Sequence, residues 1–515
     1  MSRPAPSHAG PSPAGAGGSG TGLTPKFVGV ETEFGITVDG PSEVNPVLAS
    51  SLVVGAYRAP GDRDVRWDHS DEHPLRDARG YEIPDPHEAI VDDELGLANT
   101  VLTNGARFYV DHAHPEYATP ECSNARDLVI WDKAGERILE DAAARAATTL
   151  PPGSRVLVHK NNTDGKGAAY GTHENYLVNR DVPFGRLTRQ LLPFFVSRLL
   201  YVGAGRIGTE FDRDVPFQLS QRADFFEVEV GLETTLKRPL MNTRDEPHAD
   251  PDRYRRLHVI NGDANLCEVA TFLKVGTMLL VLDVLEEESL PALPGLAHPV
   301  QAFQQVSHDL TCSRPLRMDD GTRMTALEIQ WAYLEACKRS VKERAVDDPV
   351  VADVLTRWET VLTTAGSDPR ALSGQVDWAT KLELMEGYRQ RHGLDWDHDR
   401  LKMVDLQYHD VRQDKGLYQR LAARGRVEKL VTEHEVQAAI ASPPADTRAW
   451  FRGECIRRFR KQIVAAGWDA LIFDLGRDTL QRIPMMEPGR GTQEQLQGLL
   501  DEVTDAADLL ERLTS

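Results

Sequence analysis

The clearest alternation of polar and apolar residues follows an Asn-Gly turn signal at residues 104–105. The polar positions are Arg107, Tyr109 and Asp111, and the apolar positions between them are Phe108 and Val110. Because successive side chains of a strand point to opposite faces, the apolar pair can enter a core while the polar three share the other face. Pro115 interrupts the pattern, and the acids Glu116 and Glu121 follow. The pattern indicates either an edge strand with a solvated polar face or a functional strand.

A second strand pattern covers residues 28–36 and carries Glu31 and Glu33 two positions apart. Both carboxylates therefore leave the same face of the strand. The apolar neighbours, among them Val30 and Phe34, indicate a strand inside a sheet rather than at its edge. Two acids on one strand face repel each other unless a cation lies close to them. We expect either two solvated glutamates or a platform for a hard metal ion.

Helix and strand patterns alternate through the remainder of the chain without an internal repeat. Apolar residues spaced three and four apart predict helices, and short apolar runs bounded by turn residues predict strands. The predicted helices cover residues 126–149, 184–201, 268–285 and most of 325–424, and the predicted strands cover residues 154–159, 225–230 and 470–473. The most apolar run, 275–285, contains an aspartate and is too short to span a bilayer, so we expect it inside a core.

The length of 515 residues is too great for one simple core and favours two domains. Residues 1–24 are rich in Pro, Gly, Ala and Ser and predict a disordered tail rather than a signal peptide. We assign residues 25–430 to a large domain and residues 431–515 to a small C-terminal domain. A long insertion at about 40–92, rich in proline and charged residues, indicates a functional lid or a disordered segment.

The charge balance excludes one broad class of function. A net charge of −20 and a pI near 5.3 make the chain a poor general nucleic-acid binder, because a phosphate backbone would repel it. Five widely spaced cysteines without a C-x-x-C motif argue against a disulfide framework or a zinc site. They favour reduced thiols and hence a cytoplasmic location.

Further polar residues stand where they could bind a nucleotide or a metal ion. His173 and Asn175 follow a Gly-rich loop and share one face of the next predicted strand. Arg222 and Arg244 flank the strand at 225–230 and are either surface residues or a clamp for phosphate oxygens. The histidine could equally be a hydrogen-bonded core residue, and Trp468 could simply pack in the C-terminal core.

Three of these patterns resemble known protein families. Residues 28–36 resemble the first metal-binding strand of the glutamine synthetase and glutamate–cysteine ligase superfamily, in which a Glu-x-Glu-Phe sequence holds magnesium under ATP. The strand with His173 and Asn175 is similar to a later nucleotide-binding strand of that superfamily. Residues 107–121 resemble a narrower family, the Pup ligase and the Pup deamidase, which share Arg-x-Tyr-x-Asp followed by His-Pro-Glu-Tyr and a threonine. Smaller matches extend over residues 26 to about 492.

The resemblance implies the fold and the roles of the site residues. The fold would be α+β, with a large domain built on a mainly antiparallel, curved sheet backed by helices and a small C-terminal α/β domain. Asp111 would be the catalytic carboxylate. The implied metal-binding residues are Glu31, Glu33, Tyr109, Glu116, His173 and His258, and the implied ATP-binding residues are Arg107, Thr119, Asn175, Arg222, Arg244 and Trp468. His258 stands where related synthetases carry an acid, and imidazole is a softer ligand than magnesium prefers.

Two features are closer to the deamidase branch of this family than to the ligase branch. The insertion at about 40–92 resembles a loop that marks the deamidase, and the spacer between Asp111 and His114 is one residue shorter than in the ligase. The resemblance therefore implies an ATP-dependent hydrolase that converts the C-terminal Gln of Pup, a small ubiquitin-like modifier, to Glu and cleaves the Pup–lysine isopeptide bond. Because no Cys-His or Ser-His-Asp signature is present, Asp111 would attack the amide or act as base on water.

The same resemblance implies the cofactors and partners. The cofactors would be ATP, or ADP with phosphate, and Mg²⁺. The partners would be Pup and pupylated proteins, with no nucleic acid and no membrane, and we expect a monomer. Pup is acidic and disordered and would fold into a locally basic groove, for which Lys237, Arg238 and Arg253 are candidates. The alternatives are a Pup–protein ligase, a small-molecule glutamate–amine ligase and a nucleotide-sensing scaffold without activity.

Overall fold

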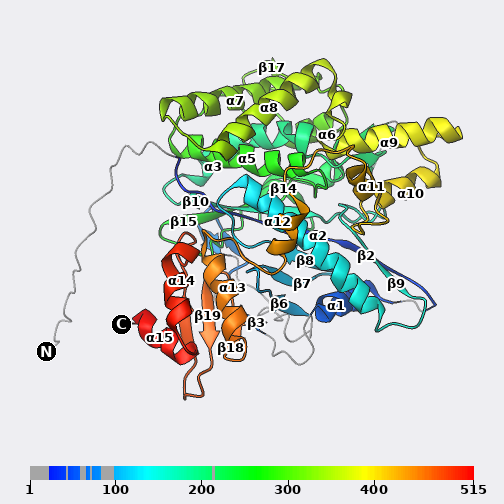
Figure 1. The fold of residues 1–515 in the computed structure, drawn as a ribbon. Helices are drawn as coiled ribbons and strands as arrows, with labels where there is room; N and C mark the ends of the chain where they lie inside the picture. The colour runs from blue at the N-terminus through cyan, green and yellow to red at the C-terminus, as the bar shows by residue number, and fades with distance from the viewer. Residues whose placement is uncertain are drawn as a thin grey trace.

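A six-stranded antiparallel sheet forms the centre of the molecule (Figure 1). The computed structural model describes residues 23–41, 44–57, 65–69, 72–82, 98–210 and 215–514. The strand order is β15-β10-β1-β8-β7-β6, and each neighbouring pair is antiparallel. The strands are β1 (Val28–Glu33), β6 (Asn99–Val101), β7 (Arg107–Asp111), β8 (His114–Ala118), β10 (Thr172–Asn179) and β15 (Tyr254–Val259). An antiparallel sheet combined with helices confirms the predicted α+β class.

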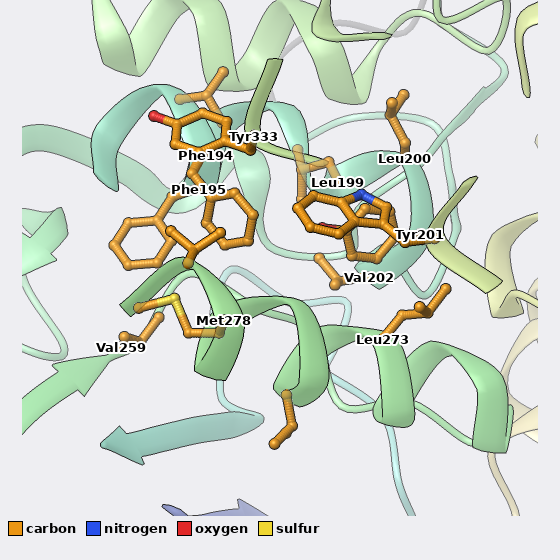
Figure 2. Close-up of a cluster of buried hydrophobic side chains, with 14 of the residues drawn as sticks. Phe194, Phe195, Leu199, Leu200, Tyr201, Val202, Val259, Leu273, Met278 and Tyr333 are labelled. Atoms are coloured by element: carbon orange, nitrogen blue, oxygen red, sulfur yellow. The ribbon is translucent and has the colours of Figure 1, made fainter. Parts of the chain in front are cut away.

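Helices cover one face of this sheet because alternate strand residues on that face are apolar. Val30 of β1, Val178 of β10 and Val259 of β15 are all buried in one hydrophobic core. Figure 2 shows part of this core, in which Phe195 and Met278 from two helices gather with Val259. The sheet therefore has an apolar face packed against helices and an opposite face that is free to carry polar side chains.

The helices agree well with the predicted ranges. The helices between the insertion and the C-terminal elements are α2 (Ala125–Ala147), α3 (Phe184–Ser197), α4 (Leu199–Val202), α5 (Glu268–Glu286), α6 (Pro299–Ser307), α7 (Ala326–Glu343), α8 (Pro349–Ser367), α9 (Asp377–His392), α10 (Asp399–Tyr408), α11 (Leu417–Ala423) and α12 (Glu433–Ala439). In Figure 1, α3, α5, α7 and α8 lie together above the sheet. Side chains fix several starts: Asn124 caps α2, and Thr325 with Glu328 forms a capping box on α7.

The predicted single strand at 28–36 is wrong, because the chain changes sheets after Glu33. β1 ends there, and β2 (Gly35–Asp39) pairs instead with β9 (Arg155–His159). Gly35 permits the change: a Cβ at this position would lie 2.4 Å from the hydroxyl of Tyr170 and 2.5 Å from Oδ1 of Asn161. Only glycine fits this close approach.

The C-terminal elements build a second, four-stranded sheet, in orange and red in Figure 1. The elements are α13 (Arg448–Phe459), β18 (Ile463–Ala466), β19 (Ala470–Phe473), β20 (Gln481–Pro484), α14 (Gln493–Glu502) and α15 (Ala506–Thr514). Its fourth strand is β3 (Arg66–Trp67), which pairs parallel with β18 although it belongs to the predicted insertion. The described part of the insertion also contains α1 (Pro46–Ala56), β4 (Arg76–Asp77) and β5 (Tyr81–Glu82).

Short two-stranded pairs complete the structure. They are formed by β11 (Arg206–Ile207) with β12 (Phe217–Gln218), β13 (Phe226–Gly231) with β14 (Arg238–Asn242), and β16 (Leu316–Arg317) with β17 (Arg323–Met324). Most of the predicted tail at 1–24 lies outside the described residues, and the domain boundaries stay predictions. All five cysteines are described, buried and free, as predicted. No helix within the described ranges is long and apolar enough to cross a bilayer.

Candidate functional site

The register of the central strands brings the predicted acids to one face of the sheet. Residues directly opposite each other in antiparallel strands project to the same side. Glu33 of β1 is opposite Glu116 of β8, and Glu116 is opposite Tyr109 of β7. Arg107 and Asp111 lie two residues to either side of Tyr109 and share that face. The predicted polar face of β7 is confirmed, with its apolar residues buried behind it in a second core.

The other half of the site comes from β10 and β15. Glu31 of β1 is opposite His173 of β10, and Asn175 of β10 is opposite His258 of β15. Oε1 of Glu31 lies 3.2 Å from Nδ1 of His173 and 3.8 Å from Nδ1 of His258. These three side chains offer ligand atoms within 4.8 Å of one another, close enough to hold one metal ion. The donor set fits a divalent cation, although two imidazoles are softer ligands than Mg²⁺ prefers.

The protonation states of this cluster suit metal binding. Burial opposes the charged form of Glu31, but the hydrogen bond with His173 and the positive charge of Arg256 bring its pKa well below the ordinary value. Burial holds the pKa of His258 well below its ordinary value, so its imidazole is neutral. Among the described residues, Nε2 of His258 has no hydrogen-bond partner. A carboxylate beside a neutral imidazole is the state that metal ligands require.

The acids nearer to β7 repel one another strongly. Burial raises the pKa of Glu116 well above its ordinary value, and the negative charges of Asp111, Glu31 and Glu33 add to the shift. Burial also raises the pKa of Tyr109, whose hydroxyl is hydrogen-bonded to Glu116. Like charges this close cannot all stay ionised unless a cation neutralises them. The carboxylate and phenol oxygens fit a hard divalent ion such as Mg²⁺.

Asp111 ends β7 at the edge of this acidic face. Its side chain is 42% exposed, so water or a substrate can reach the carboxylate. Nδ1 of His112 lies 3.0 Å from Oδ1 of Asp111. Burial opposes the charged form, but the hydrogen bond and charge of His112 lower the pKa of Asp111 below its ordinary value. An ionised, reachable carboxylate can attack a carbonyl carbon or take a proton from water.

A pocket opens along β1 beside these acids, between the central sheet and the C-terminal elements. Its lining includes Phe27, Val28, Gly29, Glu31, Thr119, Glu121, Asn175, His248, Arg256, Arg448, Trp468 and Pro488. A lining that combines apolar and aromatic groups with charged side chains suits a ligand that has both a flat ring and an anionic part. Three residues predicted to bind ATP, Thr119, Asn175 and Trp468, therefore lie in one pocket with Glu31.

Local contacts hold the predicted ATP-binding residues in place. Oγ1 of Thr119 accepts a hydrogen bond of 3.0 Å from the backbone N–H of Val30. The ring centroid of Trp468 lies 5.1 Å from that of Trp67. The guanidinium of Arg107 lies 4.1 Å from the Trp67 ring and 3.9 Å from the ring of Tyr109. Trp67 of the insertion thus joins the β7 strand to the C-terminal sheet at the pocket.

Two predicted phosphate ligands, Arg222 and Arg244, are not among the residues that line this pocket. Arg222 is fully buried, and its Nη1 donates a hydrogen bond of 2.9 Å to the carbonyl of Gly262. Its Nε and Nη2 have no partner among the described residues, and burial lowers its pKa. Burial also lowers the pKa of Arg244. The positive charge of Arg256 lowers it further, and the negative charge of Glu31 opposes the shift. A role for these two residues in phosphate binding stays a prediction.

One site residue that the sequence analysis does not single out is Arg256. Its Nε donates a hydrogen bond of 2.7 Å to Oδ1 of Asn175, and its Nη2 lies 3.7 Å from Oε1 of Glu31. Arg256 is two residues from His258 on β15, so the same alternation that placed the histidine also placed the arginine. That alternation was the available signal.

One of the three basic residues predicted for a partner groove is buried, so the prediction is wrong for this residue. Arg238 is buried, and its guanidinium donates hydrogen bonds to the backbone carbonyls of Thr234 and Ala169. Charge alone does not distinguish a surface arginine from a buried one, and β14 is buried along its whole length. Lys237 and Arg253 are exposed and stay predictions.

Comparisons with known proteins agree on one family. The family model described as Pup-ligase protein matches residues 26–472. The chain is 55% identical over 501 residues to the depupylase of Acidothermus cellulolyticus, covering 95% of this chain and 99% of the relative. It is 51% identical over 502 residues to the Pup deamidase/depupylase of Mycobacterium tuberculosis, with the same coverage of 95% and 99%. Identity to the Pup–protein ligase of Kineococcus radiotolerans is 40% over 411 residues, covering 79% and 90%.

Two solved structures share the fold over most of the chain. The complex between Pup and its ligase PafA is similar with a TM-score of 0.78 at 32% identity, covering 93% of each chain. PafA in complex with ADP is similar with a TM-score of 0.71 at 34% identity, covering 82% of this chain and 95% of that chain. The architecture described above is thus that of a known enzyme fold.

Proposed function

The chain belongs to the Pup-ligase family, and we propose that within this family it is a hydrolase rather than a ligase. It converts the C-terminal glutamine of Pup to glutamate and cleaves the isopeptide bond between Pup and a lysine of a tagged protein. The observation that carries this choice is the higher identity, over nearly the whole chain, to the depupylases than to the Pup–protein ligase. Pup and pupylated proteins are accordingly its macromolecular partners.

The pocket along β1 takes the nucleotide, as ATP or as ADP with phosphate. Trp468, Thr119 and Asn175, which line the pocket, would hold the nucleotide, the indole through its flat ring and the other two through their polar groups. Arg107, Arg222 and Arg244 supply positive charge to the phosphates. The lining of the pocket supports the parts given to Thr119, Asn175 and Trp468, and the ADP complex of PafA, a relative with the same fold, supports a nucleotide site. Arg107, Arg222 and Arg244 do not line the pocket, and their part rests on the family resemblance alone.

Residues on the acidic face of the sheet would hold magnesium. The proposed ligands are Glu31, Tyr109 and Glu116, with Glu33, His173 and His258 close by. The mutual repulsion of the buried acids supports this assignment, because it leaves a demand for positive charge between them. When bound, the ion would stabilise negative charge on phosphate and on the amide oxygen.

Asp111 carries out the chemical step on the side-chain amide. Its carboxylate attacks the carbonyl carbon, or it removes a proton from the water that attacks. Either route consumes one water and breaks the carbon–nitrogen bond. The nitrogen leaves with the proton it needs, as ammonia from glutamine or as the lysine amine from an isopeptide. The lowered pKa of Asp111 keeps the carboxylate ionised and ready for both routes.

Incubation of the purified protein with Pup ending in Gln, ATP and Mg²⁺ tests the proposal. We expect mass spectrometry to show conversion of the terminal amide to the acid, and a Pup–lysine conjugate to be cleaved under the same conditions. Conjugates formed from Pup ending in Glu would instead assign a ligase. Turnover of free glutamate with an amine would assign a small-molecule ligase, and tight ATP binding without any turnover would assign a scaffold.

A further inference from the structure

A two-residue turn, His112 and Ala113, joins β7 to β8 directly after the proposed catalytic carboxylate. Asp111 and His114 are the paired residues that flank it. His112 has a φ of 51°, in the left-handed region. Glycine usually occupies the first position of such a turn, and among other residues asparagine, aspartate and histidine are the ones enriched at positive φ. The chain therefore carries a histidine at a backbone conformation that most side chains rarely adopt.

Packing does not explain this histidine. Its side chain is 63% exposed, so it buries little apolar surface. The turn is held by another residue: Ser50 of α1 is fully buried, and its hydroxyl donates a hydrogen bond of 2.8 Å to the carbonyl of Ala113. When a residue in an unusual backbone conformation contributes little to packing, the contacts of its side chain are the remaining structural explanation.

The turn conformation brings the side chain of His112 into contact with Asp111, the proposed reacting group. In a continued strand, residue 112 would point to the face opposite Asp111. The left-handed turn instead brings Nδ1 of His112 to 3.0 Å from Oδ1 of Asp111. A hydrogen bond to one carboxylate oxygen limits rotation of the carboxylate and fixes the direction of its lone pairs.

We propose that His112 is a positioning residue that orients the carboxylate of Asp111 toward the Pup amide. This inference rests on the proposed function, in which Asp111 is the reacting group. His112 acts through Asp111 and does not touch the substrate. Misplacing a reacting group by about 1 Å lowers the rate by about 10²-fold.

Two substitutions of His112 separate the effect of its side-chain contact on turnover from the effect of its backbone conformation. Glycine and asparagine both accept the left-handed turn, but only asparagine retains a side-chain N–H that can donate to Asp111. We expect His112→Gly to lower kcat on Pup ending in Gln by about 10- to 100-fold, with KM and ADP affinity nearly unchanged. His112→Asn should restore most of the lost turnover. Thermal melts should show His112→Gly to be at least as stable as the parent, since glycine suits the turn.

A matched control and a reference variant complete the experiment. Ala345, outside the site, also has a left-handed φ, of 49°, so Ala345→Gly relieves similar strain and should keep parental turnover. Full turnover by His112→Gly would overturn the positioning role, as would an equal loss in His112→Asn or a raised Mg²⁺ requirement in both variants. Asp111→Ala, assayed in parallel, distinguishes failure of the positioning role of His112 from failure of the proposed function. Parental turnover in Asp111→Ala would overturn the proposed function itself.

Discussion

The guanidinium of Arg256 lies at the junction between the pocket and the acidic face. Besides its hydrogen bond to Asn175, its Nη1 lies 3.5 Å from Oε2 of Glu246 and its Nη2 lies 3.7 Å from Oε1 of Glu31. The side chain is only 12% exposed. Because its contacts to the two acids are long, they neutralise this largely buried cation only in part. The guanidinium can therefore still attract an anionic ligand such as a nucleotide phosphate.

We therefore predict that Arg256→Met weakens ADP binding by about 10- to 100-fold. Methionine keeps an unbranched chain but removes a charged hydrogen-bond donor, whose contribution is about 1.5–3 kcal/mol. Arg253→Met is the matched control, because Arg253 is 57% exposed and pairs with Glu487 at the surface. Its effect should stay below about fivefold. Isothermal titration with ADP measures both, and equal losses would contradict a specific role for Arg256.

Individual site residues were predictable where the signal is local. The period of two along a strand gave the shared face of Arg107, Tyr109 and Asp111 correctly, because it depends only on backbone geometry. The left-handed conformation of His112 was not predictable, since no glycine or asparagine marks it. The buried position of Arg222 depends on contacts with residues distant in sequence. Such contacts cannot be predicted from composition or local pattern.

At the scale of elements, helix α2 crosses behind β8 where Gly135 meets Tyr117. A Cβ at Gly135 would lie 2.4 Å from Cδ1 of Tyr117. The Tyr117 ring is 2% exposed, and Nδ2 of Asn104 donates a hydrogen bond of 3.2 Å to its hydroxyl. Tyr117 directly follows Glu116 on β8, so this close contact packs the helix against the strand that carries an acid of the site.

Gly135→Ala should consequently destabilise the fold by about 1–3 kcal/mol through overpacking. In an open helix position the same change stabilises by about 0.5–1 kcal/mol. Gly498→Ala on α14 provides that control, because no atom lies within 4 Å of its added Cβ. Urea unfolding compares the two free energies of unfolding. Stabilisation by both substitutions would contradict the tight contact.

The elements themselves were largely predictable, and their exceptions have tertiary causes. Helices α2 and α5 and strand β19 match their predicted ranges, because amphipathic spacing and turn residues are local signals. The strand predicted at 28–36 divides at Phe34, because Gly35 lies against Tyr170 and Asn161 from another part of the chain. Pairing of β3 with β18 likewise joins segments distant in sequence.

At the scale of the whole molecule, one acid connects the central sheet to the C-terminal elements. Glu121, shortly after β8, forms ion pairs with Arg448 and Arg452 of α13. Nη1 of Arg452 also donates to the carbonyl of Trp468 at 3.0 Å, and Nη1 of Arg448 donates to the carbonyl of His248 at 2.7 Å. Glu121 thus fixes the side of the pocket that Trp468 and His248 line.

This clamp should make stability depend on pH in acid. Burial opposes the charged form of Glu121, but Arg452 and Arg448 lower its pKa to about 2 from an ordinary value of 4.5. The unfolded chain therefore binds this proton more readily than the folded chain. The ion pairs stabilise the fold fully above pH 4.5, and their contribution is lost as pH falls from 4.5 to about 2.

Urea unfolding at a series of pH values measures this loss. We expect the free energy of unfolding of the parent to fall more steeply over that window than that of Glu121→Gln, which has no proton to gain. At neutral pH the substitution itself should cost about 3–5 kcal/mol, because it leaves two buried arginines without their counter-charge. Parallel pH profiles for parent and variant would show that other acids dominate.

The most direct test compares nucleotide binding with turnover in Asp111→Ala. An acidic sheet face that holds Mg²⁺ and nucleotide, with Asp111 as a separate reacting group, predicts that the two properties separate. Turnover of Pup ending in Gln should fall by about a thousandfold or more, while ADP affinity measured by titration calorimetry stays close to that of the parent. Parental turnover in Asp111→Ala would contradict the assignment.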